Sequence, residues 1–195
     1  NSYITGRTLS PSFPVTSGVF DPTHNGNEDV FVTKINAGGT GIVFSTFLGG
    51  TFYDEGRGIA VDATGNIYIT GTATAAFPTT SGAFDETFNG GSDVFVTKLS
   101  PNGSALLYST YAGASGIDGA TDLAIDSAGS AYVVVRTSDN PVDFPTTPGA
   151  FDTTHNGFDD VAVAKFNASG TALVYSTFLG GSNIDNPEAI VVNSA

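Results

Sequence analysis

The sequence contains no cysteine, methionine or tryptophan among its 195 residues. The absence of cysteine excludes disulfide bonds, thiolate metal sites and a cysteine nucleophile. No run of about 18 apolar residues is present, so no membrane-spanning helix is expected. Residues 1–13 show neither a basic region nor an apolar core, so no signal peptide is recognised there.

Basic residues are also scarce, because 6 lysines and arginines face 19 aspartates and glutamates, for a net charge of −13. Nucleic acids and anionic membrane surfaces are bound by basic surfaces, so this charge argues against both as partners. An acidic surface favours solubility and attracts divalent cations instead.

Turn-forming and strand-forming residues are abundant. The chain has 25 glycines, 9 prolines, 15 phenylalanines and 7 tyrosines, and 40% of its residues are hydrophobic. No stretch of a dozen residues shows an apolar period of 3.6. The composition therefore predicts an all-β chain with many turns and a sizeable core.

One stretch, Asp93–Gly113, has the pattern of a β-hairpin. β-Branched and aromatic residues at 94–97 precede a turn at Ser100-Pro101-Asn102-Gly103, and a second strand follows at 106–111. The same pattern occurs at 29–50 and at 160–181. Three hairpins at a regular spacing indicate an internal repeat.

The remaining motifs keep fixed offsets from the hairpins. Phe-Pro pairs at 13, 77 and 144 lie 64 and 67 residues apart. Each unit of about 65 residues is expected to contain four short strands, which in the second unit lie at 58–62, 66–71, 93–98 and 106–111. The units are approximately 1–56, 57–120 and 121–188, and 189–195 is the inner strand of a further or shared blade.

Four short strands at this period are typical of a β-propeller blade. The sequence therefore predicts an all-β propeller segment of three four-stranded blades. The connection at 71–92 exceeds the usual loop length, so it is expected to be compact and anchored by phenylalanines. The third unit carries an extra insertion at 138–141.

The two ends of the chain are complementary in pattern. The chain opens on the second strand of a unit, at 1–6, and closes on a first strand, at 189–192. Propellers usually have four to eight blades. The ends therefore predict head-to-tail joining, through the terminal strands, to other copies or to further blades. Two chains would give a ring of six blades, and a join that does not close would give a filament.

The hairpin of Asp93–Gly113, with FSTFLGG at 44–50 and GIAVDATGNIYITGTATAAFPTT at 58–80, resembles the SBBP family of bacterial β-propeller repeats. The resemblance covers essentially the whole chain. It implies a propeller of four-stranded blades in a large secreted or cell-surface bacterial protein. It carries over no catalytic residues.

The pattern Asp-x-Thr-x-Asn-Gly-x-x-Asp occurs once in each unit. Oxygen side chains at this spacing, with a glycine at position 6, resemble the first part of a calcium loop, and Ca²⁺ is the cofactor considered. Valine occupies position 12, where such a loop has a bidentate carboxylate. The alternative is that these side chains cap their own turns. The candidate metal ligands are Asp21, Asn25, Asp29, Asp85, Asn89, Asp93, Asp152, Asn156 and Asp160.

Three other sets recur once per unit. Asp54, Asp118 and Asp185 precede the inner strands and form either hydrogen bonds between blades or a carboxylate ring at one mouth of the channel. His24 and His155 alternate with Phe88, which indicates stacking rather than catalysis. Lys34, Lys98 and Lys165 end the third strands, where each is expected to pair with a carboxylate.

These observations favour a non-enzymatic extracellular or cell-surface module with a structural or interaction role, because repeat arrays suit adhesion, surface layers and fibres. The alternative is a propeller that binds carbohydrate or calcium, with another protein or a glycan as partner. A glycan-cleaving enzyme is a third hypothesis, because glycosidases use paired carboxylates. Its candidates are acids found in one unit only, namely Glu55, Glu86, Asp139, Asp143 and Asp159.

Overall fold

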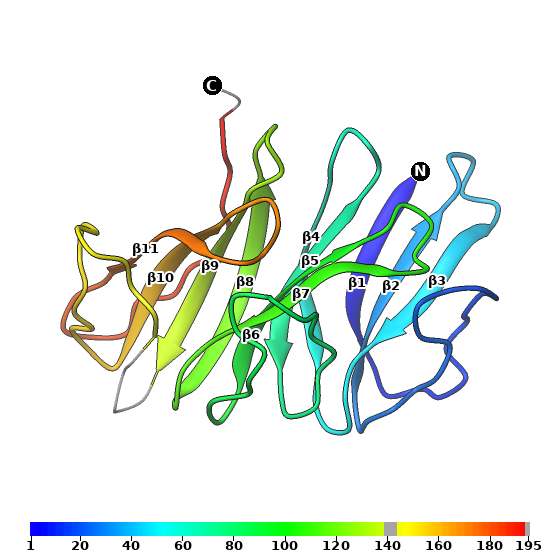
Figure 1. The fold of residues 1–195 in the computed structure, drawn as a ribbon. Helices are drawn as coiled ribbons and strands as arrows, with labels where there is room; N and C mark the ends of the chain where they lie inside the picture. The colour runs from blue at the N-terminus through cyan, green and yellow to red at the C-terminus, as the bar shows by residue number, and fades with distance from the viewer. Residues whose placement is uncertain (139–143, 194–195) are drawn as a thin grey trace.

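The structure is a computed structural model that describes residues 1–138 and 144–193. Its regular structure within these residues consists of β-strands alone, which confirms the all-β prediction. None of the described segments is a helix long and apolar enough to cross a membrane. The strands form three antiparallel sheets, arranged side by side as a fan (Figure 1).

Each sheet is built from strands that follow one another in the chain. In the second and third sheets the first strand lies at one edge and the last at the other, as expected of propeller blades. The first sheet comprises β1 (Ser2–Thr8), β2 (Asp29–Ile35) and β3 (Ile42–Leu48). The second comprises β4 (Glu55–Val61), β5 (Ile67–Ala73), β6 (Asp93–Leu99) and β7 (Leu106–Ala112). The third comprises β8 (Ile117–Ile125), β9 (Ala131–Ser138), β10 (Asp159–Phe166) and β11 (Leu173–Leu179).

The predicted hairpin is the outer half of the second sheet, β6 paired with β7. Thr97 lies opposite Ser109, and their hydroxyls form a buried hydrogen bond of 2.8 Å. The turn closes where Gly103 N–H donates to the carbonyl of Ser100 at 2.9 Å. The hairpins β2–β3 and β10–β11 have the same register. The hydroxyl pair recurs in β2–β3 as Thr33 with Ser45 at 2.8 Å, whereas Ala164 lies opposite Ser176 in β10–β11.

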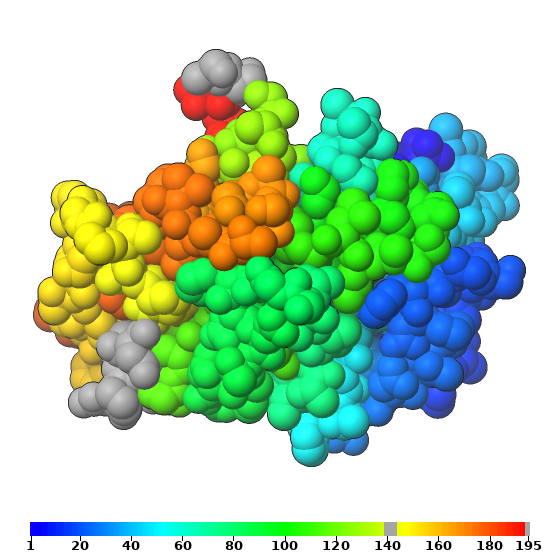
Figure 2. All heavy atoms as spheres, in the orientation of Figure 1, coloured from blue at the N-terminus to red at the C-terminus, as the bar shows by residue number. Residues whose placement is uncertain are grey.

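Two apolar interfaces hold the fan together. Between the first and second sheets, Val30, Val32 and Phe44 pack against Ile69 and Phe95. An equivalent cluster, built around Val94, Val96, Tyr108, Val133 and Phe166, lies between the second and third sheets. Alternate residues of each strand thus face the previous sheet and the next sheet. The atoms of the three sheets form one continuous body (Figure 2).

The long connections are compact, as predicted. Phe77 is buried and stacks on Phe95 with ring centroids 4.4 Å apart. Phe13 contacts Phe31 in the same way at 4.5 Å, and Phe144 is buried in the third sheet's cluster. Phenylalanine therefore ties each connection to its own sheet. Of the predicted insertion, only Ser138 lies within the described residues, and it ends β9.

Two details of the sequence prediction do not appear within the described part of this chain. The first sheet has three strands instead of four, and residues 189–192 form no strand; their role as the inner strand of a further or shared blade stays a prediction. The reason is common to both, because an inner strand is held only by hydrogen bonds to the second strand of its own blade. The segment at 189–192 has no second strand beside it, and β1 has no first strand. The unit boundaries 1–56, 57–120 and 121–188 stay predictions.

The position of a residue in the fan predicts the effect of truncating it. Ile4 and Ile69 occupy the same position in β1 and β5, but Ile69 is 0% exposed and Ile4 is 41% exposed. We expect Ile69→Ala to lower the free energy of unfolding by about 2–5 kcal/mol, because it leaves a cavity between two sheets. Ile4→Ala should cost less than about 1 kcal/mol in dilute protein. Urea unfolding of both variants measures the difference, and equal losses would contradict this packing.

Candidate functional site

The three Asp-x-Thr-x-Asn-Gly-x-x-Asp loops adopt one conformation. In the first loop, the Asp21 carboxylate accepts hydrogen bonds from Thr23 N–H and Thr23 Oγ1, at 2.9 and 2.8 Å. It also accepts one from the Asn25 side-chain amide at 2.5 Å. The backbone of Asp21 is fixed in turn by Thr46 of β3, whose hydroxyl accepts from Asp21 N–H at 2.9 Å. Asp85 and Asp152 have the equivalent partners.

The last aspartate of each loop caps the turn from inside the protein. Asp29 is fully buried, and its carboxylate accepts from Asn25 N–H at 2.6 Å and Gly26 N–H at 3.0 Å. Asp93 accepts from Asn89 N–H, and Asp160 from Asn156 N–H, both at 2.8 Å. Asp29 begins β2, Asp93 begins β6, and Asp160 lies near the start of β10.

The nine predicted metal ligands therefore come together in three separate loops, where they hydrogen-bond to N–H donors. No group of three or more His, Cys, Asp or Glu side chains suited to a metal ion occurs among the residues that the structure describes. The turn-capping alternative accounts for the spacing, because an aspartate that accepts local N–H groups is a common turn former. Calcium binding by these loops stays a prediction.

Asp54 is the most perturbed carboxyl group in this region. It is buried behind the Asp29 loop, where it accepts from Gly50 N–H at 2.6 Å and Thr74 N–H at 2.9 Å. Burial raises the pKa of Asp54 to about 6, although the two N–H groups oppose the shift; the nearby Asp29 carboxylate adds to it. Asp118 and Asp185 accept equivalent bonds from Ala114 N–H and Gly181 N–H. All three aspartates thus form hydrogen bonds, but to N–H groups four residues earlier in the connection that precedes the inner strand. The carboxylate ring at a channel mouth stays a prediction.

The structure tests the predictions for the recurring aromatic and lysine residues. His24, Phe88 and His155 each pack against a ring of the last strand of their sheet, with centroids 5.5–6.0 Å apart. The rings meet edge to face for the two histidines and tilted for Phe88, so these residues have an aromatic packing role instead of parallel stacking. Lys98 and Lys165 pair with Asp62 and Asp126 at 3.8 and 3.2 Å. Lys34 lies over the ring of Tyr3 instead, and no ion pair of Lys34 is found in the described part of the chain.

Comparison with known proteins supports the repeat. Residues 43–78 match the family model described as SBBP, a beta-propeller repeat. The chain contains an SBBP repeat. The matched segment runs from β3 through β4 and β5 to Phe77-Pro78, so it crosses from the first sheet to the second. No curated protein matches the chain.

Comparison of equivalent positions in the three sheets points to a cavity that the sequence analysis did not predict. In the first and third sheets an arginine pairs with an acid across two strands, Arg7 with Glu28 and Arg136 with Asp159. In the second sheet the same two positions hold Thr72 and Ser92. The short side chains leave a cavity of about 250 Å³ between the second and third sheets. In the sequence, the signal for this cavity was that threonine and serine replace the arginine and the acid in the second unit.

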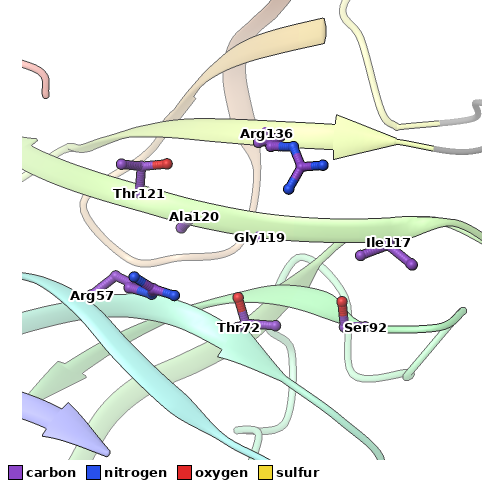
Figure 3. A pocket seen from close by; sticks show the side chains of 8 residues that line it. All are labelled: Arg57, Thr72, Ser92, Ile117, Gly119, Ala120, Thr121 and Arg136. Carbon is purple, nitrogen blue, oxygen red and sulfur yellow. The ribbon is translucent and has the colours of Figure 1, made fainter. Parts of the chain in front are cut away.

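Two arginines line this cavity from opposite sides (Figure 3). Arg57 comes from β4, where its guanidinium donates to Glu55 at 2.8 Å. Arg136 comes from β9 and donates twice to Asp159, at 3.0 and 2.6 Å. The hydroxyl groups of Thr72, Ser92 and Thr121 complete the polar lining, which suits a small ligand with several hydroxyl groups.

The candidate acids of the glycosidase hypothesis have structural partners. Glu55 and Asp159 form the ion pairs just described, and the Glu86 carboxylate accepts from Gly82 N–H at 2.8 Å. Asp139 and Asp143 lie outside the described residues.

The buried Asp54 predicts a pH dependence of stability. Its pKa is about 6 in the folded protein and about 3.9 in an unfolded chain, so the folded state binds the proton more tightly. This contribution is fully present below about pH 4 and is lost as the pH rises through 6, by up to roughly 3 kcal/mol. Asp54→Asn should remove that slope in chemical denaturation between pH 4 and 7.5.

Asp62 provides the control of opposite sign. Burial raises its pKa, but hydrogen bonds from Thr64 and Asn66 prevail and lower it to about 2. Its contribution is therefore present above about pH 4 and lost below that pH. Asp62→Asn should leave the slope between pH 4 and 7.5 unchanged. An Asp54→Asn variant that keeps the parent slope would contradict the assignment.

Proposed function

We propose that the chain is a non-enzymatic structural and interaction module, a rigid β-propeller scaffold whose two end sheets bind further blades head to tail. The SBBP repeat supports a structural or interaction role in general. The aspartates of the three repeated loops cap turns, and the loops hold neighbouring sheets together. Of the acids considered for catalysis, Glu55, Glu86 and Asp159 lie in the described residues and are engaged in ion pairs or a turn hydrogen bond, which supports a scaffold over an enzyme.

The observation that carries the proposal is the exposure of one end sheet. Tyr175 and Leu179 of β11 are 38% and 56% exposed, whereas Phe44 and Leu48, which hold the same positions in β3, are 3% and 0% exposed. The buried pair faces the next sheet of the fan. Contiguous exposed apolar side chains mark an interaction surface. The outer face of the third sheet is therefore shaped to receive another sheet.

We place this module outside the cell or on its surface, as the family resemblance implies. Labelling of intact source cells with an antibody against the protein would test that location. Labelling that appears only after the cells are broken would contradict it. The partner does not need to be basic, because the contacts expected at the end sheets are apolar and backbone contacts.

The oligomeric state tests the proposal. We expect light scattering to give multiples of the 19.8 kDa chain mass that grow with concentration. Leu179→Asp should abolish this association, because it places a charge in the interface. Leu107→Asp is the matched control: Leu107 is 51% exposed, and its counterparts Val43 and Val174 are also exposed. A chain that remains monomeric at every concentration would refute head-to-tail binding.

The cavity between the second and third sheets supports a second function, the binding of a small carbohydrate. Two arginines, each fixed by a carboxylate, and three hydroxyl groups surround it. The guanidinium groups donate hydrogen bonds to sugar hydroxyls, and the hydroxyl groups both donate and accept them. The volume of about 250 Å³ lies just below the usual range for ligand pockets, roughly 300–1,000 Å³, so a monosaccharide unit is the expected ligand.

Calorimetry with a panel of monosaccharides tests this second function. Arg57→Ala should weaken binding by about tenfold or more, because it removes hydrogen bonds from a charged donor. Lys34→Ala, in β2 and away from this cavity, should leave binding unchanged. Heats indistinguishable from dilution for every sugar would remove carbohydrate from consideration.

A further inference from the structure

We infer that residues 186–192 of one copy form the inner strand of a composite fourth blade, whose other three strands are β1, β2 and β3 of a second copy. This inference rests on the proposed head-to-tail function and specifies its partner, its strands and its register. The fan itself supplies the template, because each contact expected between copies already occurs twice within the chain.

The terminal segment begins as an inner strand does. Asp54 N–H, just before β4, donates to Glu28 O at 2.9 Å, and Asp118 N–H of β8 donates to Ser92 O at 2.8 Å. Asp185 N–H donates to Asp159 O in the same way at 2.8 Å. The chain thus enters a fourth blade with the geometry of the second and third. Beyond this point it lacks a strand to pair with.

The segment also lies where an inner strand belongs. Ile190 N–H donates to the Asp122 carboxylate of β8 at 3.1 Å, so the segment runs beside the inner strand of the third sheet. Val191 is 87% exposed, and the segment projects from the body beside β8 (Figures 1 and 2). β1 of the same chain lies against β4, at the other end of the fan. This β1 is therefore out of reach of the segment, and the β1 of a second copy offers the same edge.

The register follows from the two complete sheets. Ile59 lies opposite Ile69, and Leu123 lies opposite Val133. The sequence of 185–193 aligns with 54–62 and 118–126, which places Ile190 opposite Ile4 of the second copy. Val191 then lies opposite Tyr3. The pairing covers Ile4, which is 41% exposed in this chain, while Ile69 and Val133 are fully buried.

The pairing also supplies a polar partner for Lys34. Lys98 and Lys165 each lie over a tyrosine and pair with an aspartate at the end of the inner strand, Asp62 or Asp126. The corresponding residue of the terminal segment is Asn193. In the composite blade its side-chain oxygen accepts a hydrogen bond from Lys34 of the second copy, which already lies 5.1 Å above the Tyr3 ring.

A third contact comes from the hairpin turns. Phe20 N–H donates to Gly103 O in the next sheet at 2.8 Å, and Phe84 N–H donates to Gly170 O at 2.9 Å. Both glycines have φ near +70°, and a Cβ on either would collide with the ring of Phe44 or Tyr108. The next pair in the series joins Phe151, 85% exposed, to Gly39 of a second copy.

Within the described part of the chain, no ring covers Gly39. It has the same positive φ, +68°, but a Cβ placed on it meets nothing within 4 Å. In the composite interface, the Tyr175 ring of the first copy covers it, as Phe44 covers Gly103. Phe151, Tyr175 and Gly39 thus repeat, between copies, a contact that the chain makes twice internally.

Gly39→Asn tests this contact. Asparagine tolerates a positive φ, so the fold should be retained, while its side chain collides with Tyr175 of the other copy. We expect association to weaken at least tenfold, measured by analytical ultracentrifugation. Gly82→Asn is the matched control. Gly82 also has a positive φ, +80°, and a Cβ placed on it meets nothing within 4 Å, but it lies in the connection between β5 and β6. Equal association of the two variants would overturn the inference.

Disulfide trapping tests the register in a chain that has no cysteine of its own. The variant Ile4→Cys with Ile190→Cys places the two Cα atoms directly opposite, within disulfide reach. The control, Ile4→Cys with Val192→Cys, is shifted by two residues and exceeds that reach. We expect at least about fivefold more covalent oligomer from the first pair.

The outcomes separate the two proposals. If the unmodified chain stays monomeric, head-to-tail binding and the composite blade are both wrong. If it associates but the 4–190 pair gives no more covalent oligomer than the control, only the composite blade is wrong, and another surface joins the copies. Covalent dimers alone indicate a closed pair, and a ladder of higher species indicates a longer ring or a filament.

Discussion

A β-sheet with two apolar faces is stable only when another sheet covers each face, and this constraint organises the whole chain. In β6 the sequence VFV sends its valines toward the third sheet and its phenylalanine toward the first, and in β2 the valines of the same sequence face the second sheet. Each face of a sheet therefore contributes one side of an apolar interface. The middle sheet is covered twice, and its residues form most of the fully buried core. The outer two sheets each retain one face that the same pattern made apolar.

The polar groups follow from the same constraint. Long connections that pass from one strand to the next leave backbone N–H groups beneath the surface, and these groups need acceptors. Asp29 and Asp54 provide them for the first loop and for the crossing to β4. Burial raises the pKa of Asp54, and the nearby Asp29 carboxylate adds to the shift. The repeated aspartates are thus a consequence of stacking sheets through long loops, and their spacing resembles a calcium loop because both arrangements turn the chain around oxygen atoms.

The sequence was sufficient for the features that depend on local pattern and on repetition. The hairpins, the strand order, the aromatic packing of His24, Phe88 and His155, and the anchoring by Phe77 all follow from residues compared between units. The conformation of 189–192 did not follow, because a strand depends on a partner and not on its own residues alone. Arg7–Glu28, Thr72–Ser92 and Arg136–Asp159 were equally hard to foresee. These pairs join residues about 20 positions apart, and only the sheet register brings them together.

An open strand edge such as β1 is a risk for any protein, because its free N–H and C=O groups accept whatever strand arrives first. The net charge of −13 limits random association through general repulsion, but it does not select a partner. In the proposed composite blade, selection comes from side chains along the edge: Ile4 faces an apolar residue, Lys34 an oxygen acceptor at the strand end, and Gly39 an aromatic ring. A strand that satisfies all three at the correct spacing is rare. The terminal segment of this same chain carries Ile190 and Asn193 three residues apart, as Ile59 of β4 and Asp62 are. Such a combination makes the edge selective without any basic or acidic patch dedicated to recognition.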